Sequence, residues 1–332
     1  MKIGFFETRG EEKDYLKRRL KKYSLKFFEE PLTLDNVSKA RNFKIISVFT
    51  QSRIDKKILS KLPNLKLIAT RSTGFDHISL KECKKRRICV SYVPTYGGNT
   101  VAEHTFALTL ALSRKLWKAR QKLERRDFSI DGLQGFDLHG KTIGVIGYGT
   151  IGFHVVEIAK AFGMEVIVMD LHPDLDLEEV LGIEFVTLKE LLKRSDVVTL
   201  HVPYNKSTHH MINWKTLKLM KKDALLINTS RGGVVDTNAL IKALEKKKIG
   251  GAGLDVIEGE DVLKEEMELL DAKEKMERIS ELARDERLFR REDIIFTPHI
   301  AFYSKEAVER ILETTVENIE KFSEGKAINR IS

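Results

Sequence analysis

The fold is decided by residues 142–170, which read TIGVIGYGTIGFHVVEIAKAFGMEVIVMD. The apolar run TIGVI predicts a strand, which leads into the glycine pattern of Gly147, Gly149 and Gly152 and then into a helical segment. A second apolar run follows and ends in Asp170. A strand, a glycine turn, a helix and a strand ending in an acid form the pattern of a dinucleotide-binding unit.

Each position of this pattern has a physical role. Gly147 permits a tight turn, Gly149 lets the backbone approach a pyrophosphate, and Gly152 lets the helix pack close to the strand. The helix N-terminus adds unpaired N–H groups and a partial positive charge. Asp170 can accept hydrogen bonds from both ribose hydroxyls of NAD and would repel the 2′-phosphate of NADP. The sequence therefore predicts NAD as the cofactor, because a glycine turn with an unrelated acid requires several coincidences.

Short apolar runs alternate with helical patterns in both directions from this stretch. The alternation predicts an α/β fold with two doubly wound parallel-sheet domains. Near-continuous apolar runs of this kind are typical of central parallel strands, which are buried on both faces. Strands are predicted at residues 3–6, 45–49, 65–70, 89–93, 142–147, 165–170, 197–202, 224–230, 251–256 and 294–299.

Two helical segments bear on the domain organisation. Residues 99–125 contain no Gly or Pro and predict one long helix, and residues 305–322 predict a final helix with one apolar face. This last helix follows the last strong strand and could return to pack on the first half. We therefore predict a discontinuous domain of residues 1–99 and 300–332 around a domain of residues 100–299.

Composition limits the function classes. The chain has 332 residues, 42% of them hydrophobic, which suffices for two domains and a large core. No apolar run reaches the roughly 18 residues that cross a membrane, and the N-terminus lacks a secretory signal, so a cytoplasmic protein without membrane contact is expected. Two cysteines, Cys83 and Cys89, exclude a disulfide scaffold. No cysteine and histidine cluster has zinc-ligand spacing, so no metal is expected.

The formal net charge of +9 raises the possibility of nucleic-acid binding. The positive charge is scattered in short runs, such as residues 84–87 and 246–248, and acidic stretches such as 258–271 interrupt it. A solvated basic surface, as in many heat-adapted enzymes, is therefore favoured, and no nucleic-acid partner is expected. Residues 261–292 predict a charged helical insertion, for which a lid flank and plain surface are equal alternatives.

Three polar residues follow predicted strands in the second half. Arg231 follows LLINTS, Glu260 follows the strand at 251–256, and His299 ends FTPH. Because ligands of an open α/β sheet bind outside the carboxyl ends of strands, these side chains should gather at the nicotinamide end of the cofactor. An arginine can bind a carboxylate, a histidine can exchange a proton with a carbonyl oxygen, and a nearby carboxylate favours the imidazolium. Each residue alone would also fit a structural role.

Several long motifs together resemble the D-isomer-specific 2-hydroxyacid dehydrogenase family, and the likeness runs essentially from end to end. The segments GE at 259–260 and HIAFY at 299–303 are most similar to the D-lactate dehydrogenase branch. The other motifs are STGFDHI (72–78), YGGNTVAEHT (96–105), GYGTIG (147–152), HVPYNKSTHHMI (201–212), NTSRGGVVDT (228–237), GLDVIEGE (253–260) and TPHIAFY (297–303).

The resemblance implies a Rossmann-type NAD domain inserted into a flavodoxin-like substrate domain, with the active site between them. Arg231, Glu260 and His299 would be the catalytic residues. Arg231 would bind the substrate carboxylate and carbonyl, His299 would be the acid and base, and Glu260 would be its partner. Glu258 is an alternative for that last role, but the family's spacing from the arginine selects Glu260.

Further residues would contact the substrate and the cofactor. Thr73 and Gly74 would offer backbone N–H groups to the substrate carboxylate, and Tyr96 and Phe302 would wall its side-chain pocket. The residues implied along NAD are Thr150 and Ile151 at the pyrophosphate, Asp170 at the adenosine ribose, Val202, Pro203 and Thr208 on the adenine side, Thr229, Ser230 and Arg231 beside the nicotinamide, and Asp255 at its carboxamide.

The predicted reaction is the reversible reduction of pyruvate to D-lactate with NADH. One alternative is another 2-keto acid, such as hydroxypyruvate, glyoxylate or phenylpyruvate, because the sequence does not fix the volume of the pocket. A second alternative, from a different class, is an NAD(H)-sensing binding protein similar to the corepressors that share this fold. The resemblance also implies a homodimer through the NAD domains, to which residues 99–125 would contribute.

Overall fold

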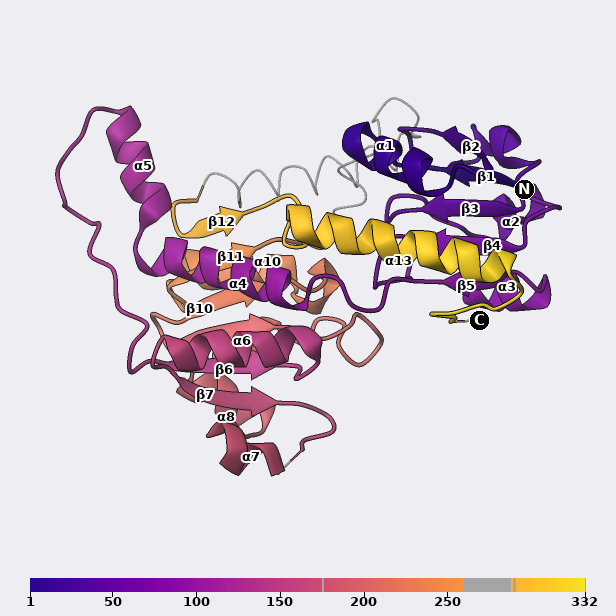
Figure 1. The fold of residues 1–332 in the computed structure, drawn as a ribbon. Helices are drawn as coiled ribbons and strands as arrows, with labels where there is room; N and C mark the ends of the chain where they lie inside the picture. Colours follow the sequence, from indigo (N-terminus) through magenta and orange to yellow (C-terminus); the bar gives the residue numbers. More distant parts are fainter. Residues whose placement is uncertain (175, 260–287, 289–290, 332) are drawn as a thin grey trace. The chain divides into compact units, whose positions relative to one another are not determined.

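A computed structural model describes residues 1–174, 176–259, 288 and 291–331 of the chain. The chain divides into two compact units. The first unit comprises Met1–Tyr96 and Ser304–Ser332, and the second comprises Gly97–Tyr303. Each unit contains one parallel β-sheet with helices on both faces, so the chain has the two doubly wound α/β sheets that the sequence predicts (Figure 1).

The sheet of the first unit has five strands in the order β2-β1-β3-β4-β5, and all its strand pairs are parallel. This is the flavodoxin-like order, in which the chain reverses its direction of sheet growth next to the first strand. The strands are β1 (Lys2–Phe5), β2 (Ser24–Phe27), β3 (Ile45–Val48), β4 (Leu67–Thr70) and β5 (Cys89–Ser91).

Helices cover both faces of this sheet. Helices α1 (Gly10–Arg19) and α13 (Lys305–Ser323) pack on one face, where Leu16, Leu312 and Val316 join side chains of β1, β3 and β4. The final helix therefore belongs to the first unit. The other face is covered by the short helices η1 (Val37–Ala40), α2 (Lys56–Ser60) and α3 (Leu80–Lys85).

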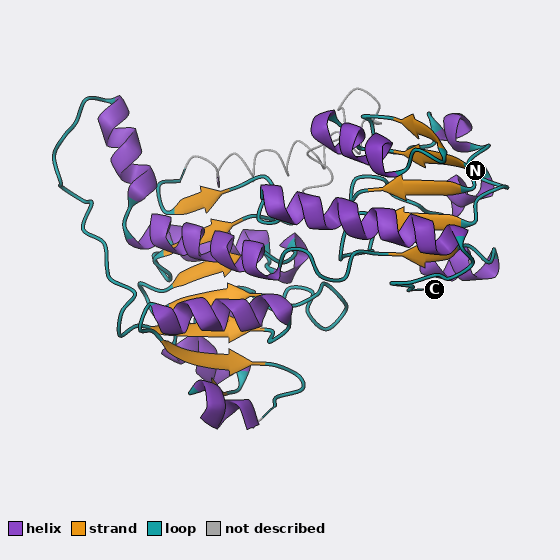
Figure 2. Ribbon diagram, in the orientation of Figure 1, coloured by secondary structure: helices purple, strands orange, loops and turns teal. Residues whose placement is uncertain are grey.

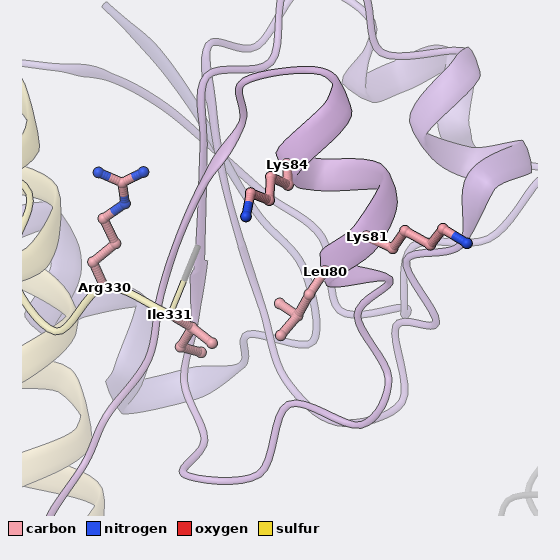
Figure 3. Close-up of a pocket in the computed structure, with 5 residues that line it drawn as sticks. All are labelled: Leu80, Lys81, Lys84, Arg330 and Ile331. Carbon is pink, nitrogen blue, oxygen red and sulfur yellow. The ribbon is translucent and has the colours of Figure 1, made fainter.

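A surface pocket of about 440 Å³ lies beside α3 in the first unit (Figure 3). Leu80 and Ile331 face each other across it, and Lys84 and Arg330 contribute positive charge. Lys81 also lines the pocket, but its side chain points away from the others. None of the residues predicted to bind cofactor or substrate lies in this pocket.

The sheet of the second unit has seven parallel strands in the order β12-β11-β10-β9-β6-β7-β8. The chain starts in the middle at β6, builds outward to β8, and then crosses to β9 on the other side. This is the order of a Rossmann sheet, extended by one strand. The strands are β6 (Thr142–Ile146), β7 (Glu165–Met169), β8 (Glu184–Phe185), β9 (Val197–Leu200), β10 (Leu225–Asn228), β11 (Gly251–Leu254) and β12 (Ile294–Phe296).

Helices α4 (Gly98–Ser113) and α6 (Thr150–Ala161) pack side by side on one face of this sheet (Figure 2). The opposite face packs against α8 (Leu188–Arg194), α9 (Trp214–Leu217) and α10 (Thr237–Glu245). Helix α7 (Asp176–Leu181) packs near the β8 edge. None of the described helices has both the length and the apolar character needed to cross a membrane.

The prediction of one long helix over residues 99–125 is wrong. The helix ends at Ser113, and a separate helix α5 (Leu116–Glu124) projects from the sheet (Figure 1). Lys115 between them has a φ of 56°, in the left-handed region that a continuing helix cannot use. The Ser113 carbonyl instead accepts a hydrogen bond from the N–H of Phe136, where the chain returns. This long-range contact leaves no signal in the local sequence.

Most of the predicted strands form within a residue or two of their expected ends, and two strands were not predicted. Strand β2, SLKF, alternates exposed and half-buried residues at a sheet edge, and β8 has only two residues. Both lack the continuous apolar run by which central strands are recognised. Most of the predicted insertion at 261–292 lies outside the described residues.

Candidate active site

The glycine turn after β6 has the geometry that its pattern predicts. Gly147 has a φ of 97°, and a Cβ there would lie 2.7 Å from the carbonyl oxygen of His201. A Cβ at Gly152 would lie 2.1 Å from the carbonyl oxygen of Gly147, so the first turn of α6 packs directly on the glycine turn. A Cβ at Gly149 would meet no atom within 4 Å. Two glycines therefore make the turn, and the third leaves an open approach to the backbone.

This turn fits the pyrophosphate of a dinucleotide. Helix α6 begins at Thr150, and no described side chain caps its N-terminus, so its first N–H groups point out of the helix end. Such an end attracts anions by its N–H donors and its dipole. Thr150 is exposed beside it, and the side chain of Ile151 packs into the core below.

Asp170 follows β7 and lies against the same turn. Its carboxylate accepts hydrogen bonds from the N–H groups of Tyr148, at 2.7 Å, and His172, at 2.9 Å. Burial raises the pKa of Asp170, but the N–H groups of His172 and Tyr148 outweigh this effect and hold the pKa below its ordinary value. The carboxylate is therefore ionised at neutral pH, as an acceptor for ribose hydroxyls must be.

The segment after β9 contains the residues predicted on the adenine side. Val202 packs against the core, whereas Pro203 is exposed. The hydroxyl of Thr208 donates to the carbonyl of Pro203 at 2.7 Å and accepts from the N–H of Asn205 at 2.9 Å. Thr208 thus closes a surface turn with its own side chain, and its contact with adenine stays a prediction.

Strands β10, β11 and β12 end at the same level. Asn228 of β10 pairs in register with Leu254 of β11, and Leu254 pairs with Phe296 of β12. The residues that follow these strands therefore stand next to one another at the carboxyl edge of the sheet. Arg231, Asp255 and His299 all belong to these three segments.

Asn228 holds the turn that contains Arg231. This asparagine is fully buried, and its side-chain oxygen accepts from the N–H and the hydroxyl of Ser230. Its side-chain amide donates to the carbonyl of Arg231 at 3.0 Å, and its own carbonyl accepts from the N–H of Asp255. The guanidinium of Arg231 donates to the carbonyl of Ser230 at 2.8 Å, and the side chain is half-buried. Thr229, next to it, bonds by its hydroxyl to Thr105 of α4.

Asp255 holds the turn that contains His299. Its carboxylate is fully buried and accepts from the N–H of Ile300 at 2.9 Å, the N–H of Ala301 at 2.8 Å, and the hydroxyl of Thr297 at 2.5 Å. The N–H of His299 in turn donates to the carbonyl of Asp255 at 2.8 Å. His299 has a φ of 57°, which a residue other than glycine seldom adopts. The buried carboxylate thus fixes a strained backbone that presents the imidazole.

His104 of α4 completes this network and was not predicted from the sequence. Its Nε2 lies 3.0 Å from the hydroxyl oxygen of Thr297 and 3.6 Å from the carboxylate of Asp255. The hydroxyl proton of Thr297 is donated to Asp255, so this oxygen accepts a hydrogen bond from His104. Burial lowers the pKa of His104, although the charge of Asp255 acts in the opposite direction. The only signal in the sequence was a histidine within a largely apolar helix.

Glu260, the predicted partner of His299, lies outside the described residues. Its alternative, Glu258, is described, and its carboxylate lies 2.6 Å from Nε2 of His210. The ring of Phe302 meets the ring of His299 edge to face, with 6.5 Å between the centroids. Phe302 therefore stands beside the imidazole, as a wall of the substrate pocket would.

The other predicted substrate residues belong to the first unit. Thr73 and Gly74 lie in the loop after β4, where the hydroxyl of Thr73 donates to the carbonyl of Val93 and Ser72 donates to the carbonyl of Gly74. The carbonyl of Tyr96 accepts from the guanidinium of Arg310. Their contacts with substrate stay predictions.

Comparisons with known proteins agree with this geometry. Residues 106–301 match the family model of the NAD binding domain of D-isomer specific 2-hydroxyacid dehydrogenases. A 2-hydroxyacid dehydrogenase homolog of Haemophilus influenzae is 36% identical over 100% of this chain and 99% of its own. A glyoxylate reductase of Thermococcus litoralis is 35% identical over 98% of this chain and 95% of its own. A crystal structure of the Aquifex aeolicus D-lactate dehydrogenase, complexed with NAD and lactic acid, is 41% identical and covers 97% of this chain and 96% of its own, with a TM-score of 0.86.

The second unit is thus the NAD-binding domain of a dehydrogenase, and NAD is its cofactor. The chain belongs to the D-isomer specific 2-hydroxyacid dehydrogenase family. The family and the cofactor predicted from the sequence are therefore confirmed. The particular 2-hydroxy acid and the roles of individual residues are the subject of the next subsection.

Proposed function

We propose that the protein is a D-lactate dehydrogenase, which reduces pyruvate to D-lactate with NADH and catalyses the reverse reaction. The Aquifex aeolicus enzyme supports this substrate, because it is similar over nearly the whole chain and was crystallised with lactic acid. The observation that carries the proposal is the set of hydrogen bonds by which the Asp255 carboxylate fixes the turn of His299, next to the turn of Arg231 at the same edge of the sheet.

In this proposal each side chain has one task. Arg231 binds the carboxylate of the keto acid with its planar fork of donors and polarises the carbonyl. NADH, when bound, supplies the hydride. His299 donates a proton to the carbonyl oxygen during reduction and takes it back during oxidation. Glu260 favours the charged form of His299. Asp255 keeps His299 in place. Its carboxylate is fully buried and accepts from Thr297, Ile300 and Ala301, so its contact with the cofactor carboxamide stays a prediction.

The experiment is a measurement of kcat/KM with NADH across pyruvate, glyoxylate, hydroxypyruvate and phenylpyruvate, followed by oxidation of D- and L-lactate with NAD. We expect the highest value for pyruvate and oxidation of the D isomer alone. Phe302 beside His299 supports a small side chain on the substrate. A higher value for glyoxylate or hydroxypyruvate would give the protein the activity of its Thermococcus litoralis relative instead. NADH binding without any turnover would favour an NAD(H) sensor.

We also propose a homodimer formed by the NAD-binding domains, in the cytoplasm. The support for a dimer is an arm of α5 and the following loop, whose apolar side chains Leu116, Trp117, Phe128 and Ile130 are each about half exposed or more. Light scattering should give the mass of two chains. Cys83 and Cys89 are free thiols, and this state supports a reducing compartment. Burial raises the pKa of both thiols, to about 11 for Cys83, so neither is a reactive thiolate at neutral pH.

A further inference from the structure

One pair of ionisable side chains beside the Arg231 turn has no task in the proposed reaction. Nε2 of His210 lies 2.6 Å from a carboxylate oxygen of Glu258, which makes a short hydrogen bond. The two side chains are 33% and 29% exposed, so both are partly buried. His210 comes from the segment after β9 and Glu258 from the segment after β11, so the bond joins two loops at the carboxyl edge of the sheet.

The backbone of His210 is bound to a third loop. Its N–H donates to the carbonyl of Gly233 at 2.9 Å, two residues after Arg231. Its carbonyl accepts from the side-chain amide of Asn213 at 2.8 Å. His210 has a φ of 49°, a left-handed conformation that is unusual for histidine and that these contacts maintain. Strained backbone of this kind is concentrated at functional sites.

The Arg231 turn also packs closely against the backbone of the segment that contains Glu258. A Cβ on Gly232 would lie 2.0 Å from the carbonyl oxygen of Ile257 and 2.5 Å from the backbone nitrogen of Glu258. Only a residue without a side chain allows this approach. The loops of His210 and Glu258 therefore both contact the Arg231 turn, at Gly233 and at Gly232, and the His210–Glu258 bond joins the two loops to each other.

We infer that His210 and Glu258 are positioning residues, which lock the Arg231 turn in the geometry that receives the substrate carboxylate. His210 binds the Arg231 turn through its backbone N–H and binds Glu258 through its imidazole ring. Movement of either loop therefore moves the base of Arg231. This inference rests on the proposed role of Arg231, and it assigns to Glu258 a task different from that of an acid partner for His299.

The chain offers a matched control in the preceding residue. His209 stacks on His210 with 3.9 Å between ring centroids, but its Nδ1 bonds to the hydroxyl of Tyr204, and its side chain is exposed. Among the described residues, His209 makes no hydrogen bond to the Arg231 or Glu258 segments. Its replacement removes one imidazole from the same loop and leaves in place the bond between His210 and Glu258 and the bond from the His210 N–H to Gly233.

The test compares His210→Asn, Glu258→Ala, Glu258→Gln, His209→Asn and the double variant of the first two. Asparagine tolerates the left-handed backbone of position 210 but cannot reach Glu258. We expect His210→Asn and Glu258→Ala each to raise the KM for pyruvate about tenfold, with little change in the dissociation constant of NADH, and the double variant to be no worse than either. Glu258→Gln should retain most of the wild-type KM, because an amide oxygen still accepts from the imidazole. His209→Asn should behave as wild type.

Amide hydrogen exchange at residues 233–235 gives a readout that does not depend on activity. Exchange there should accelerate in His210→Asn and not in His209→Asn. Unchanged exchange and unchanged KM in His210→Asn would overturn the inference while leaving the proposed function intact. A wild-type protein that turns over no keto acid would overturn the proposed function, and the exchange data would still decide whether the lock exists. Equal losses of NADH affinity, turnover and folding would reduce the pair to a general structural contact and also overturn the inference.

Discussion

The carboxyl edge of the second sheet has two halves that are built in opposite ways. Around β6 and β7, function depends on glycines. Because Gly147 and Gly152 have no side chain, the glycine turn packs closely against His201 and against the first turn of α6, and Gly149 leaves the backbone accessible. Around β10, β11 and β12, function depends on buried polar side chains, above all Asp255 and Asn228, that bind neighbouring turns. The first half offers space and N–H donors to a cofactor, whereas the second presents an arginine and a histidine in fixed positions.

The difference predicts that the two halves fail in different ways. Damage in the second half should abolish chemistry while the cofactor still binds. The largest effect is expected for His299→Asn, which tolerates the left-handed backbone but cannot transfer the proton. Turnover of pyruvate should fall about 100- to 10,000-fold, the usual contribution of a general acid, with the affinity for NADH retained. Steady-state kinetics and NADH fluorescence titration measure the two quantities. If turnover were to persist, His299 would not be the acid.

Damage in the first half should instead reduce the stability of the domain or its affinity for NADH, depending on which glycine is replaced. Gly152→Ala places a Cβ 2.1 Å from the carbonyl oxygen of Gly147, so either the helix or the turn must shift. We expect a loss of roughly 2–3 kcal/mol in the free energy of unfolding, as for other overpacked sites. Gly149→Ala is the matched control, since its Cβ meets no protein atom within 4 Å and its φ of −87° suits alanine.

The control sharpens the comparison, because it separates folding from cofactor binding. Gly149→Ala should fold as wild type and bind NADH about tenfold more weakly, since the added methyl occupies the approach to the pyrophosphate. Urea unfolding and NADH titration on both variants give the result. Normal NADH affinity in Gly149→Ala would mean that the cofactor backbone does not lie on this face of the turn.

The same difference explains what the sequence could predict. The glycine spacing and Asp170 lie within one continuous stretch, so their geometry follows from local patterns and was predicted in detail. The sequence also places Arg231 and His299 after strands, because the carboxyl ends of parallel strands share one edge. It does not predict that Asp255 binds the turn of His299, or that His104 joins them from a helix far away in the chain. Those contacts depend on how distant segments pack, for which one sequence holds no pattern.

The two glutamates after β11 show the same limit more sharply. Glu258 and Glu260 are separated by a single glycine, and their residue type and local sequence do not distinguish their roles. The structure assigns Glu258 a specific partner, His210, through a loop whose left-handed histidine no periodicity predicts. Motif spacing selected Glu260 for the imidazole of His299, and the bond of Glu258 to His210 is consistent with two separate tasks.

The last prediction concerns the pH dependence of stability at His201, which follows β9 at the border between the two halves. Its Nε2 lies 2.8 Å from the hydroxyl of Thr199, while its Nδ1 is buried with no hydrogen-bond partner in the part of the chain that the structure describes. Burial lowers the pKa of His201 to about 3. The histidine pKa in the unfolded chain is about 6.5. As the pH falls, the unfolded chain therefore binds a proton at this residue at a higher pH than the folded protein does.

The sign of the pH effect follows from this order of protonation. The contribution of His201 to stability is complete above about pH 6.5 and is lost as the pH falls toward 3, at about 1.4 kcal/mol for each pH unit. The lowered pKa of His104 acts in the same direction. Replacing His201 with Asn should remove its share, so that the free energy of unfolding, measured with urea between pH 6 and 4, falls less steeply than in wild type. His139→Asn, at an exposed position of the same unit, should keep the wild-type slope. Equal slopes in all three proteins would show that His201 takes up its proton at the same pH in the folded and unfolded states, and the border between the two halves would then be open to water.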